Sequence, residues 1–361
     1  MIRVAANLAW LVPGRVGGSE EYTVRLLRAV LADAPDDLDL TLIGSPALFA
    51  AYPDLAAARC VVLRGPQRWR PFRVFAESTS VYRATSSADV VHHFGGRIPA
   101  RHHGNDVVTI HDLQPLQMPE NFSATKQRYL AWALPRSARS ARLVLTPSEW
   151  VASTVVDLLG VEPIRVRAVS STWDDVDDSD PALADSLGDG PVVLYPAVTH
   201  PHKRHTLLLA AMERVVRERP DVTLVLTGGE GRAHHETATA VAASPGRVEQ
   251  LGRVSAASLR GLFRRADVLA FPSAYEGFGL PVLEAMRAGL PVVAADRSAL
   301  REIIGDTGTL VGSDDPQDWA TAIVAALDRD EERVERARRR ADQWSPAMAA
   351  GRLLAVWREL S

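Results

Sequence analysis

Short apolar runs alternate with helical segments along both halves of the chain. In the first half we predict strands at the opening RVAANLAW run, DLTLIG, Val61 to Arg64, DVVHHFG, DVVTIHD and ARLVLTPS. In the second half we predict them at PVVLYP, VTLVLTGG, RVEQLG, ADVLAFPS and LPVVAAD. Such runs suit strands that are buried on both faces of a parallel sheet. The alternation therefore predicts an α/β protein with two doubly wound, Rossmann-like domains facing each other across a cleft.

The stretch WDDVDDSDPALADSLGDG separates the two sets of strands. It is rich in aspartate, contains a proline and two glycines, and has no apolar period, which is typical of a linker. We therefore predict an N-terminal domain over residues 1–172, a linker over 173–190 and a C-terminal domain over 191–344. The last segment, 345–361, has helical spacing, and we expect it to pack across the domain junction.

Composition and charge are those of a soluble enzyme. The chain has 361 residues, of which 47% are hydrophobic, enough for two ordinary cores. Its net charge of −3 gives no reason to expect a nucleic-acid partner. Cys60 is the only cysteine, so we expect a reducing, cytoplasmic location. Pro13 and Gly14 interrupt the N-terminal apolar run, which we interpret as a strand rather than a signal sequence, and no stretch reaches the ~18 apolar residues of a membrane span.

The stretch EGFGLPVLE, from Glu276 to Glu284, carries the most specific chemistry. It follows a buried strand, and Pro281 and Gly289 predict the first position and the end of a helix, so its loop lies where open parallel sheets bind ligands. The backbone N–H groups from Gly277 to Leu280 suit an anion such as phosphate. An ionised carboxylate accepts hydrogen bonds from two hydroxyls of a diol. A diphosphate between two sugars meets these demands. Taken alone, either glutamate would more simply be a solvated charge or a charge that favours the positive end of a helix. We place Glu284 in the first turn of the helix.

These residues carry a resemblance to a known family. SAYEGFGLPVLEAMRAGLPVVAAD, with LGRVSAASLRGLFRRADVLAFPS before it and SALREIIGDTGTLV after it, resembles the donor-binding half of the family-four retaining glycosyltransferases, group 1, of the GT-B type. YPAVTHPHKRHTLLLAA and VLTGGEG are similar to other parts of that half, and PGRVGGSEEYTVRLLRAV and TIHDLQPLQMPENFS to parts of the other. The resemblance covers nearly the whole chain. It implies two Rossmann-like domains, transfer with retention at the anomeric carbon, and no metal or other cofactor, since the nucleotide sugar is a substrate.

The resemblance also implies roles for the matched residues. Glu284 would hold the ribose hydroxyls of a sugar nucleotide, and Glu276 the hydroxyls of the transferred sugar. The base would lie against the backbone near Arg253 and Val254. Backbone N–H groups would face the distal phosphate and the sugar at Gly277, Phe278 and Gly279.

A diphosphate requires more positive charge than a helix terminus supplies. The terminus contributes roughly half an elementary charge, whereas the leaving group carries about two negative charges and gains more as the glycosidic bond breaks. Lys203, ahead of a helix predicted near His205, is our candidate cation, although a lone lysine there would simply be solvated. Many relatives in the resembled family carry an arginine a few residues earlier, where this chain has AVT, so Arg204 or His202 is a further candidate.

Three histidines in this segment also suggest a zinc site: His200, His202 and His205. Lys203 and Arg204 would repel a dication, and no cysteine or carboxylate joins the histidines. We therefore expect no metal.

The first domain supplies three more candidates. His111 ends the strand DVVTI, and the resemblance implies that it donates to hydroxyls of the transferred sugar and orients the anomeric carbon; a structural histidine is the alternative. Gly17 and Gly18 precede a helix that Ser19 would cap, and they form either a plain turn or a close approach to the donor phosphate or the acceptor. Because no second carboxylate stands at a suitable spacing, we assign no general base. We expect the departing phosphate to take the acceptor's proton on the same face, with Lys203 and Glu276 completing the catalytic set.

The sequence indicates less about the acceptor than about the donor. RGPQRWRPFR, residues 64–73, interleaves arginines with aromatic residues and suits anionic lipid or a diphosphate-linked lipid at the inner face of the membrane, although a surface loop without a partner is an equal alternative. We expect transfer of a hexose, with GDP-mannose favoured over UDP-linked glucose or N-acetylglucosamine, to a glycan, lipid-linked or small-molecule hydroxyl. A nucleotide-sugar epimerase, a glycan phosphorylase and a non-catalytic nucleotide-sugar-binding subunit are the alternatives, because fold alone does not fix function.

Overall fold

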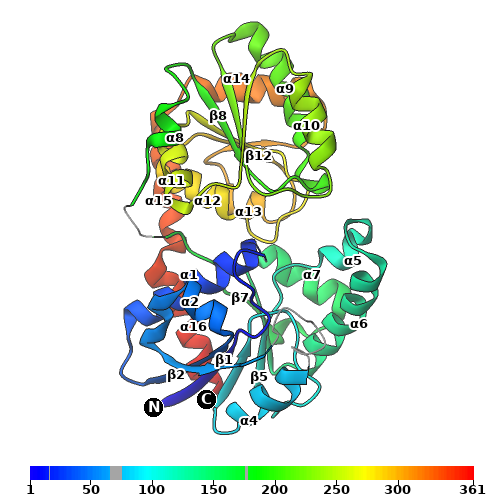
Figure 1. Cartoon of the computed structure of the whole chain (residues 1–361), viewed down its shortest axis with the longest axis vertical. Coiled ribbons are helices and arrows are strands. Elements are labelled where there is room, and N and C mark those ends of the chain that lie inside the picture. The colour runs from blue at the N-terminus through cyan, green and yellow to red at the C-terminus, as the bar shows by residue number, and fades with distance from the viewer. Residues whose placement is uncertain (16, 66–74, 175–177) are drawn as a thin grey trace. The chain divides into compact units, whose positions relative to one another are not determined.

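The computed structural model describes residues 1–15, 17–65, 75–174 and 178–361. The chain forms two compact units, each built on one parallel sheet (Figure 1). The first unit comprises Met1–Asp174 together with Trp344–Ser361, and the second comprises Asp175–Gln343. No helix within the described residues is both long enough and apolar enough to cross a membrane.

The sheet of the first unit has seven parallel strands in the order β3-β2-β1-β4-β5-β6-β7. Its central strands are buried along their whole length, as continuous apolar runs predict. The strands are β1 (Ile2–Asn7), β2 (Leu38–Gly44), β3 (Arg59–Val62), β4 (Val90–His93), β5 (Asp106–Thr109), β6 (Leu143–Thr146) and β7 (Val166–Ala168). The helices are α1 (Gly18–Asp33), α2 (Pro46–Ala51), α4 (Tyr82–Ala84), α5 (Gln114–Gln117), α6 (Ala124–Ser140), α7 (Glu149–Leu159) and α16 (Pro346–Leu360).

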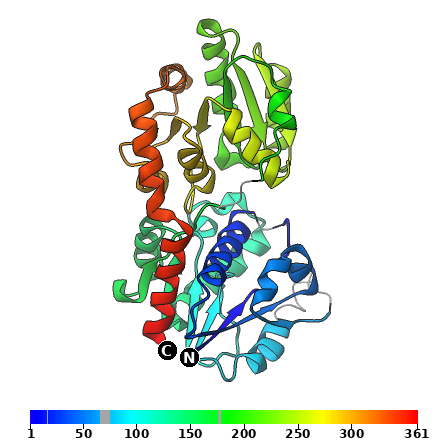
Figure 2. The ribbon, with the colours of Figure 1, turned by 90° about the vertical axis from the view of Figure 1, so that its left-hand side faces the viewer.

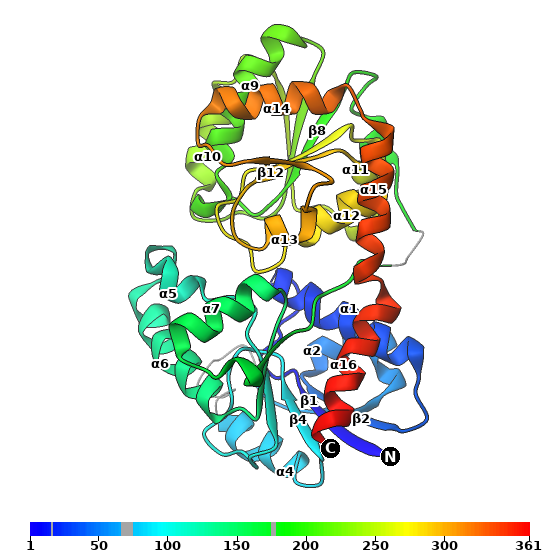
Figure 3. The same ribbon diagram turned by 180° about the vertical axis from the view of Figure 1, so that it is seen from behind.

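Helix α16 closes the first unit, although it lies at the far end of the chain. It packs against α1 and β1, and the two chain termini lie side by side in Figures 1 to 3. Leu353, Leu354 and Trp357 are each at most 2% exposed and join the same core as β1 and α1. Arg358 pairs with Asp37 at 2.8 Å. The apolar period of the last segment therefore marks the face that α16 buries in the first unit.

The second unit has six parallel strands in the order β10-β9-β8-β11-β12-β13. Helix α9 packs against α10 and α14, and α12 packs against α11 and α15 (Figure 3). The strands are β8 (Val192–Pro196), β9 (Thr223–Thr227), β10 (Arg247–Gly252), β11 (Val268–Phe271), β12 (Val292–Ala295) and β13 (Thr309–Val311). The helices are α8 (Ala182–Asp185), α9 (His205–Glu218), α10 (His234–Ala242), α11 (Ala256–Arg265), α12 (Leu280–Ala288), α13 (Leu300–Ile304), α14 (Pro316–Leu327) and α15 (Glu331–Ala341).

The predicted α/β class and both doubly wound sheets are confirmed. Each predicted strand overlaps an observed one, although β3 begins at Arg59, two residues before the predicted start. The sequence reading missed β7 and β13, which are three residues long and lie at sheet edges. Neither presents the long apolar run that identifies a central strand.

Part of the acidic segment 173–190 is held by α11 in the second unit. The N–H of Asp180 donates to the carbonyl of Ala257 at 3.0 Å, and its carboxylate accepts from the Ser258 hydroxyl at 3.0 Å. The backbone approaches so closely that a Cβ added to Gly261 would lie 2.2 Å from the Asp180 carbonyl oxygen. Glycine at position 261 therefore leaves room for the backbone of Asp180 against the helix.

Two helical glycines provide a matched test of that contact. Gly351 lies in α16, where an added Cβ would meet no atom within 4 Å. Gly351→Ala should raise the melting temperature, because alanine stabilises a helix interior by about 0.5–1 kcal/mol relative to glycine. Gly261→Ala should lower it, because the backbone of Asp180 must move. Differential scanning calorimetry of both variants checks this, and a stabilised Gly261→Ala would contradict the close approach.

Candidate active site

The sheet of the second unit reverses its strand order between β8 and β11. From β8 the chain builds outward to β9 and β10, and then returns to the other side of β8 to build β11, β12 and β13. The loops after β8 and β11 therefore leave neighbouring strands at the carboxyl edge, where doubly wound sheets bind ligands. Lys203 lies in the first loop and Glu276 in the second.

Lys203 and Glu276 form an ion pair between these two loops. The Lys203 Nζ lies 2.5 Å from Oε1 of Glu276, and the two side chains are only 17% and 13% exposed. The hydroxyl of Tyr195 donates to the Lys203 carbonyl at 2.5 Å and so holds the turn Pro201–Lys203. The ring of Phe271, at the end of β11, lies 5.8 Å from the same Nζ. The sheet edge thus holds a preformed pair of opposite charges with little access to water.

The cation of this pair is a lysine in a chain that uses arginine almost everywhere. Of the 41 lysines and arginines, only Lys126 and Lys203 are lysines. An ammonium is a compact charge on a flexible stem, whereas the planar guanidinium of arginine favours a fixed bidentate pair. Lys203 is therefore suited to exchange its carboxylate for another anion.

A third loop positions the backbone of Glu276. The Oγ of Ser298, which follows β12, accepts a hydrogen bond from the Glu276 N–H at 3.0 Å. Ser298 has a φ of 52°, a left-handed conformation that residues other than glycine adopt at a cost of about 1–3 kcal/mol. Sequence reasoning missed this residue. The signal for it was its place just beyond LPVVAAD, the strand next to the one that carries the glutamate.

Helix α12 begins one residue earlier than predicted. Gly279, with a φ of 112°, is its N-cap, and Leu280 is its first residue. Pro281 is therefore the second helical residue, and Glu284 lies in the second turn rather than in the first as predicted. The helix ends at Gly289, as predicted, with a φ of 79°. At about 1.5 Å per residue, Glu284 lies roughly 6 Å along the axis from the helix start.

The remaining donor candidates lie around this edge. Phe278 is 6% exposed, so its ring anchors the glycine loop in the unit, while Gly277 is partly exposed. Arg253 and Val254 follow β10, two strands away from β8. The Nε of Arg253 lies 3.9 Å from the position that a Cβ on Gly229, after β9, would take.

Arg204 already has a carboxylate partner. It is the N-cap of α9 with a φ of 58°, and its guanidinium pairs with Asp314. Arg297 pairs with the same carboxylate at 2.6 Å. The hydrogen bond from Arg204, together with the positive charge around it, lowers the pKa of Asp314. Two guanidinium groups therefore share one carboxylate, which leaves one net positive charge beside the loop.

Two histidines of this segment, His202 and His205, are neutral near pH 7. Burial, together with the nearby charge of Lys203, lowers the pKa of His202 to about 3. Burial likewise lowers the pKa of His205 to about 4. His200 and His202 stack with ring centroids 5.7 Å apart. His202 can therefore hydrogen-bond a phosphate but adds no charge, and no three His, Cys, Asp or Glu residues of the described segments form a group that could hold a metal.

The sheet of the first unit reverses in the same way, between β1 and β4. Gly17 ends the loop after β1 and Gly18 is the first residue of α1, and a Cβ on either would meet no atom within 4 Å. The prediction that Ser19 caps the helix was wrong: α1 begins at Gly18, and its N-cap is Gly17 with a φ of 73°. Gly17, in a left-handed conformation, takes the N-cap position, so Ser19 is the second residue of the helix. The two glycines thus border open space at the strand end.

His111, beyond the end of β5, is a neutral hydrogen-bond acceptor. Its Nε2 lies 2.7 Å from the carbonyl of Phe94, so Nε2 carries the hydrogen and donates it. Burial lowers the pKa of His111 to about 4. Rings of Tyr22 and Trp10 lie 5.0 and 5.9 Å from its own. Because the Nε2 hydrogen is engaged, Nδ1 can accept a hydrogen bond from a sugar hydroxyl but cannot donate one, unlike the donor role we expected.

Two further features lie elsewhere. Residues 66–74 fall outside the described residues, so most of the predicted basic segment 64–73 does too.

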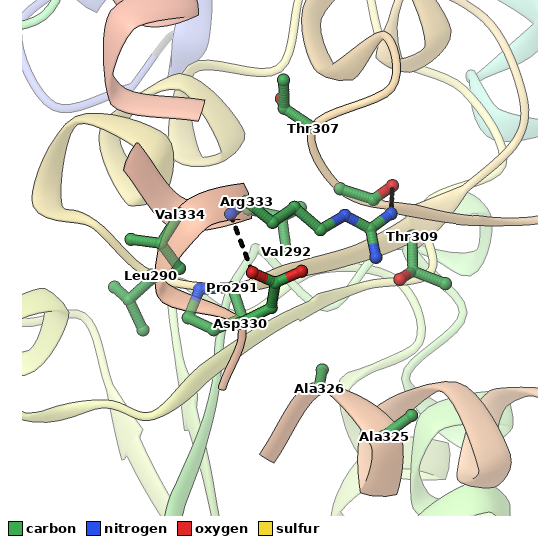
Figure 4. A pocket seen from close by; sticks show the side chains of 11 residues that line it. Leu290, Pro291, Val292, Thr307, Thr309, Ala325, Ala326, Asp330, Arg333 and Val334 are labelled. Atoms are coloured by element: carbon green, nitrogen blue, oxygen red, sulfur yellow. Dashed lines mark hydrogen bonds between the residues drawn. The ribbon is translucent and has the colours of Figure 1, made fainter. Parts of the chain in front are cut away.

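A pocket of about 70 Å³ lies between the starts of β12 and β13, with Thr307 and Arg333 among its lining residues (Figure 4). The guanidinium of Arg333 donates to the Gly308 carbonyl there. Because the strands are parallel, this pocket lies at the edge opposite Lys203 and Glu276.

Two family descriptions match the chain on either side of the linker. Residues 16–174 match "Glycosyltransferase Family 4", and residues 190–329 match "Glycosyl transferases group 1". The chain belongs to this glycosyltransferase family. The resemblance to the family-four glycosyltransferases, which the motifs of both halves carry, is therefore confirmed.

Several proteins of named function are about a third identical to this chain over the residues that align. It is 31% identical over 234 residues to O-antigen chain mannosyltransferase B of Escherichia coli, covering 62% of this chain and 61% of that protein. It is 34% identical over 168 residues to the phosphatidyl-myo-inositol mannosyltransferase of Mycolicibacterium smegmatis, covering 45% and 43%. It is 32% identical over 225 residues to the D-inositol 3-phosphate glycosyltransferase of Streptosporangium roseum, covering 57% and 48%. The matches thus span between 43% and 61% of these relatives.

Two solved structures share the fold over nearly the whole chain. HepE of Anabaena, in complex with UDP-glucose, has a TM-score of 0.75 at 18% identity, covering 99% of this chain and all of that one. A glycosyltransferase from Rickettsia africae has a TM-score of 0.75 at 15% identity, covering 99% and 98%. At these identities the likeness establishes the GT-B fold.

The ion pair makes a prediction for the protein without ligand. Lys203→Met should lower the free energy of unfolding by about 1–3 kcal/mol, because it leaves the Glu276 carboxylate desolvated without its cation. Adding Glu276→Gln should restore part of that loss, since no unpaired charge remains. Denaturant unfolding of these two variants and of Glu276→Gln alone measures the coupling. Lys126→Met, at the only other lysine, should change little; purely additive effects at 203 and 276 would contradict the pairing.

Proposed function

We propose that this chain is a retaining glycosyltransferase that moves a hexose from a nucleoside-diphosphate sugar to an acceptor hydroxyl. The observation that carries the proposal is the Lys203–Glu276 pair at the strand reversal, beside the glycine start of α12. Two of the relatives described above are named mannosyltransferases, which supports GDP-mannose as the donor. The complex of HepE with UDP-glucose keeps UDP-sugars as the next candidates.

Donor binding would work by exchange of partners. Lys203 would leave Glu276 for the diphosphate, whose second contact is the N-terminus of α12. The released Glu276 carboxylate would accept hydrogen bonds from hydroxyls of the hexose. Glu284, roughly 6 Å further along the helix, would accept them from the ribose. The base would lie near Arg253, and Arg204 would add the net charge of its cluster with Asp314.

Transfer would proceed on one face of the hexose. The bond between the anomeric carbon and the phosphate oxygen breaks, the acceptor oxygen bonds to the same carbon, and the acceptor proton passes to the departing phosphate. Lys203 and the helix terminus stabilise the charge that develops on the phosphate. His111 Nδ1 would accept a hydroxyl hydrogen and orient the ring. Positive charge from the chain takes the role that a metal has elsewhere, so we propose no metal and no cofactor.

Transfer and binding assays test this proposal together. GDP or UDP should raise the melting temperature of the wild type, because each binds only the folded state, and the shift should be smaller for Glu284→Ala. With the matching sugar nucleotide, transfer should persist in EDTA and retain the anomeric configuration by NMR. An inverted product would contradict the same-face mechanism. Donor turnover without acceptor, dependence on free phosphate, or binding without any turnover would favour the epimerase, the phosphorylase or the binding subunit.

Peripheral contact with an anionic membrane is a further part of the proposal. Helix α6 contains no acidic residue, and its exposed face carries Arg128, Trp132 and Arg139. Trp132 is 61% exposed, and the Arg136 guanidinium lies 5.8 Å from its ring. Basic and aromatic side chains on one helix face suit the surface of an anionic bilayer, at about 1 kcal/mol per basic residue. The single cysteine, Cys60, supports a cytoplasmic location at the inner face.

Vesicle sedimentation tests this contact with a charge-matched pair. Arg128→Glu should weaken binding to phosphatidylglycerol vesicles at low salt several-fold, because it reverses a charge on the binding face. Arg217→Glu makes the same charge change on exposed α9 and should leave binding nearly unchanged. Equal effects of the two changes, or no binding by the wild type, would contradict a role for α6.

A further inference from the structure

Two strained residues lie at the carboxyl edge of the second sheet. Across the described residues, three that are not glycine have a positive φ: Ala34, Arg204 and Ser298. Ala34 ends helix α1, where a left-handed residue is common. Arg204, with a φ of 58°, follows Lys203 directly. Ser298, with a φ of 52°, accepts the Glu276 N–H at 3.0 Å. Strain of this kind clusters at functional sites, where the contacts around it hold it in place.

One carboxylate holds both strained segments. Asp314, which follows β13, accepts a hydrogen bond from the Arg297 guanidinium at 2.6 Å, and the same oxygen pairs with the Arg204 guanidinium. Arg297 directly precedes Ser298 in the chain. The Asp314 side chain is 54% exposed, and ion pairs that face water contribute little to stability. Asp314 therefore matters less for the stability of the unit than for where it holds the two arginines.

Together with the charged pair, these contacts form a closed ring at the sheet edge. Lys203 pairs with Glu276, whose N–H donates to Ser298. On the other side of the ring, Asp314 joins the residue before Ser298 to the residue after Lys203. The ring links the loops after β8, β11, β12 and β13, which are consecutive neighbours in the sheet. The loop of the lysine and the loop of the glutamate are thus tied to each other by two routes.

The loop after β12 also supports the start of α12. The Ala299 N–H donates to the Glu276 carbonyl at 3.5 Å. Leu300 is fully buried, and a Cβ on Gly279, the N-cap of α12, would lie 2.9 Å from Cδ2 of Leu300. Segment 298–300 therefore contacts both the backbone of Glu276 and the glycine start of the helix.

We propose that Ser298 and Asp314 are positioning residues for the donor site, which keep the Glu276 carboxylate in place when Lys203 leaves it for the diphosphate. That exchange breaks one contact of the ring, and Glu276 is then held by its backbone contacts with the loop after β12. Ser298 sets this backbone, and Asp314 holds the segments on either side of the pair. The inference rests on the proposed function and deepens it, because it names the residues that hold the hexose-binding carboxylate.

Glycine at position 298 separates positioning from stability. Ser298→Gly removes the acceptor of the Glu276 N–H, yet glycine adopts the left-handed conformation without strain, so the melting temperature should stay near that of the wild type. In calorimetry with GDP and GDP-mannose, or with UDP and UDP-glucose, the Kd for the sugar nucleotide should rise about fivefold, the equivalent of about 1 kcal/mol, while the Kd for the diphosphate alone stays within about twofold. Ser298→Ala keeps the strain and should show the same rise with a lower melting temperature. A sugar-nucleotide Kd that is unchanged in both variants would overturn the inference.

Asp314→Asn keeps the shape of the side chain and removes its charge. The diphosphate alone should bind at least as tightly as it does to the wild type, because a nearby negative charge is gone. The sugar nucleotide should lose about fivefold in affinity relative to the diphosphate. Asp328→Asn removes another exposed partner of an arginine in the same unit, Arg219 at 3.3 Å, and should leave both Kd values within about twofold. Equal tightening of the two ligands in Asp314→Asn would show an effect of charge alone and overturn the role of Asp314.

Nitrogen-15 labelling of lysine monitors the pair without any nucleotide. In ligand-free Ser298→Gly, the side-chain signal of Lys203 should shift from its wild-type position, because its partner Glu276 is displaced although no charge has changed, and the Lys126 signal should stay. If the Lys203 signal shifts but the wild type transfers nothing from any sugar nucleotide, the proposed function fails while the positioning stands. If the wild type transfers a hexose but neither the Lys203 signal nor the sugar-nucleotide Kd changes in the variants, the inference fails while the proposed function stands.

Discussion

Two opposite charges share a poorly hydrated edge of the second sheet, and the proposed binding site is built on them. Lys203 and Glu276 are 73 residues apart in the chain, and they meet because β8 and β11 become neighbours where the strand order reverses. Each charge stabilises the other there, because a desolvated charge without its partner lowers the free energy of unfolding. An anionic substrate that takes the lysine must therefore offer the glutamate something in return, and hydroxyls next to a phosphate do so.

The two units use the same strand order for opposite electrostatic purposes. In the second unit the charged pair Lys203–Glu276 lies at the reversal, and the pair Arg204–Asp314 lies beside it. At the corresponding edge of the first unit, burial keeps His111 uncharged. Under the proposed function, the charged groups would suit a diphosphate, and the uncharged imidazole would suit a sugar hydroxyl. The two sheet edges thus differ because different side chains come after their strands.

Much of this architecture was predictable from the chain alone. Apolar runs in the sequence identify the buried strands. Because parallel strands have their carboxyl ends at one edge of the sheet, the proximity of Lys203 and Glu276 could be predicted. The details that failed depend on backbone angles and tertiary contacts that no residue type specifies. A positive φ at Gly17 moved the helix start ahead of Ser19, and the positive φ of Ser298 turned a serine after a strand into the support of Glu276. The edge strands β7 and β13 were missed because their pairing, rather than their composition, makes them strands.

The most direct measurement follows the Lys203 ammonium itself. The chain has only two lysines, so nitrogen-15 labelling of lysine gives two side-chain signals, with Lys126 as an internal reference. On titration with the nucleoside diphosphate that raises the melting temperature, the account predicts a saturable shift of the Lys203 signal and an unchanged Lys126 signal, as the ammonium exchanges Glu276 for phosphate. A Lys203 signal that does not move while the nucleotide is bound would contradict the exchange at the centre of the account.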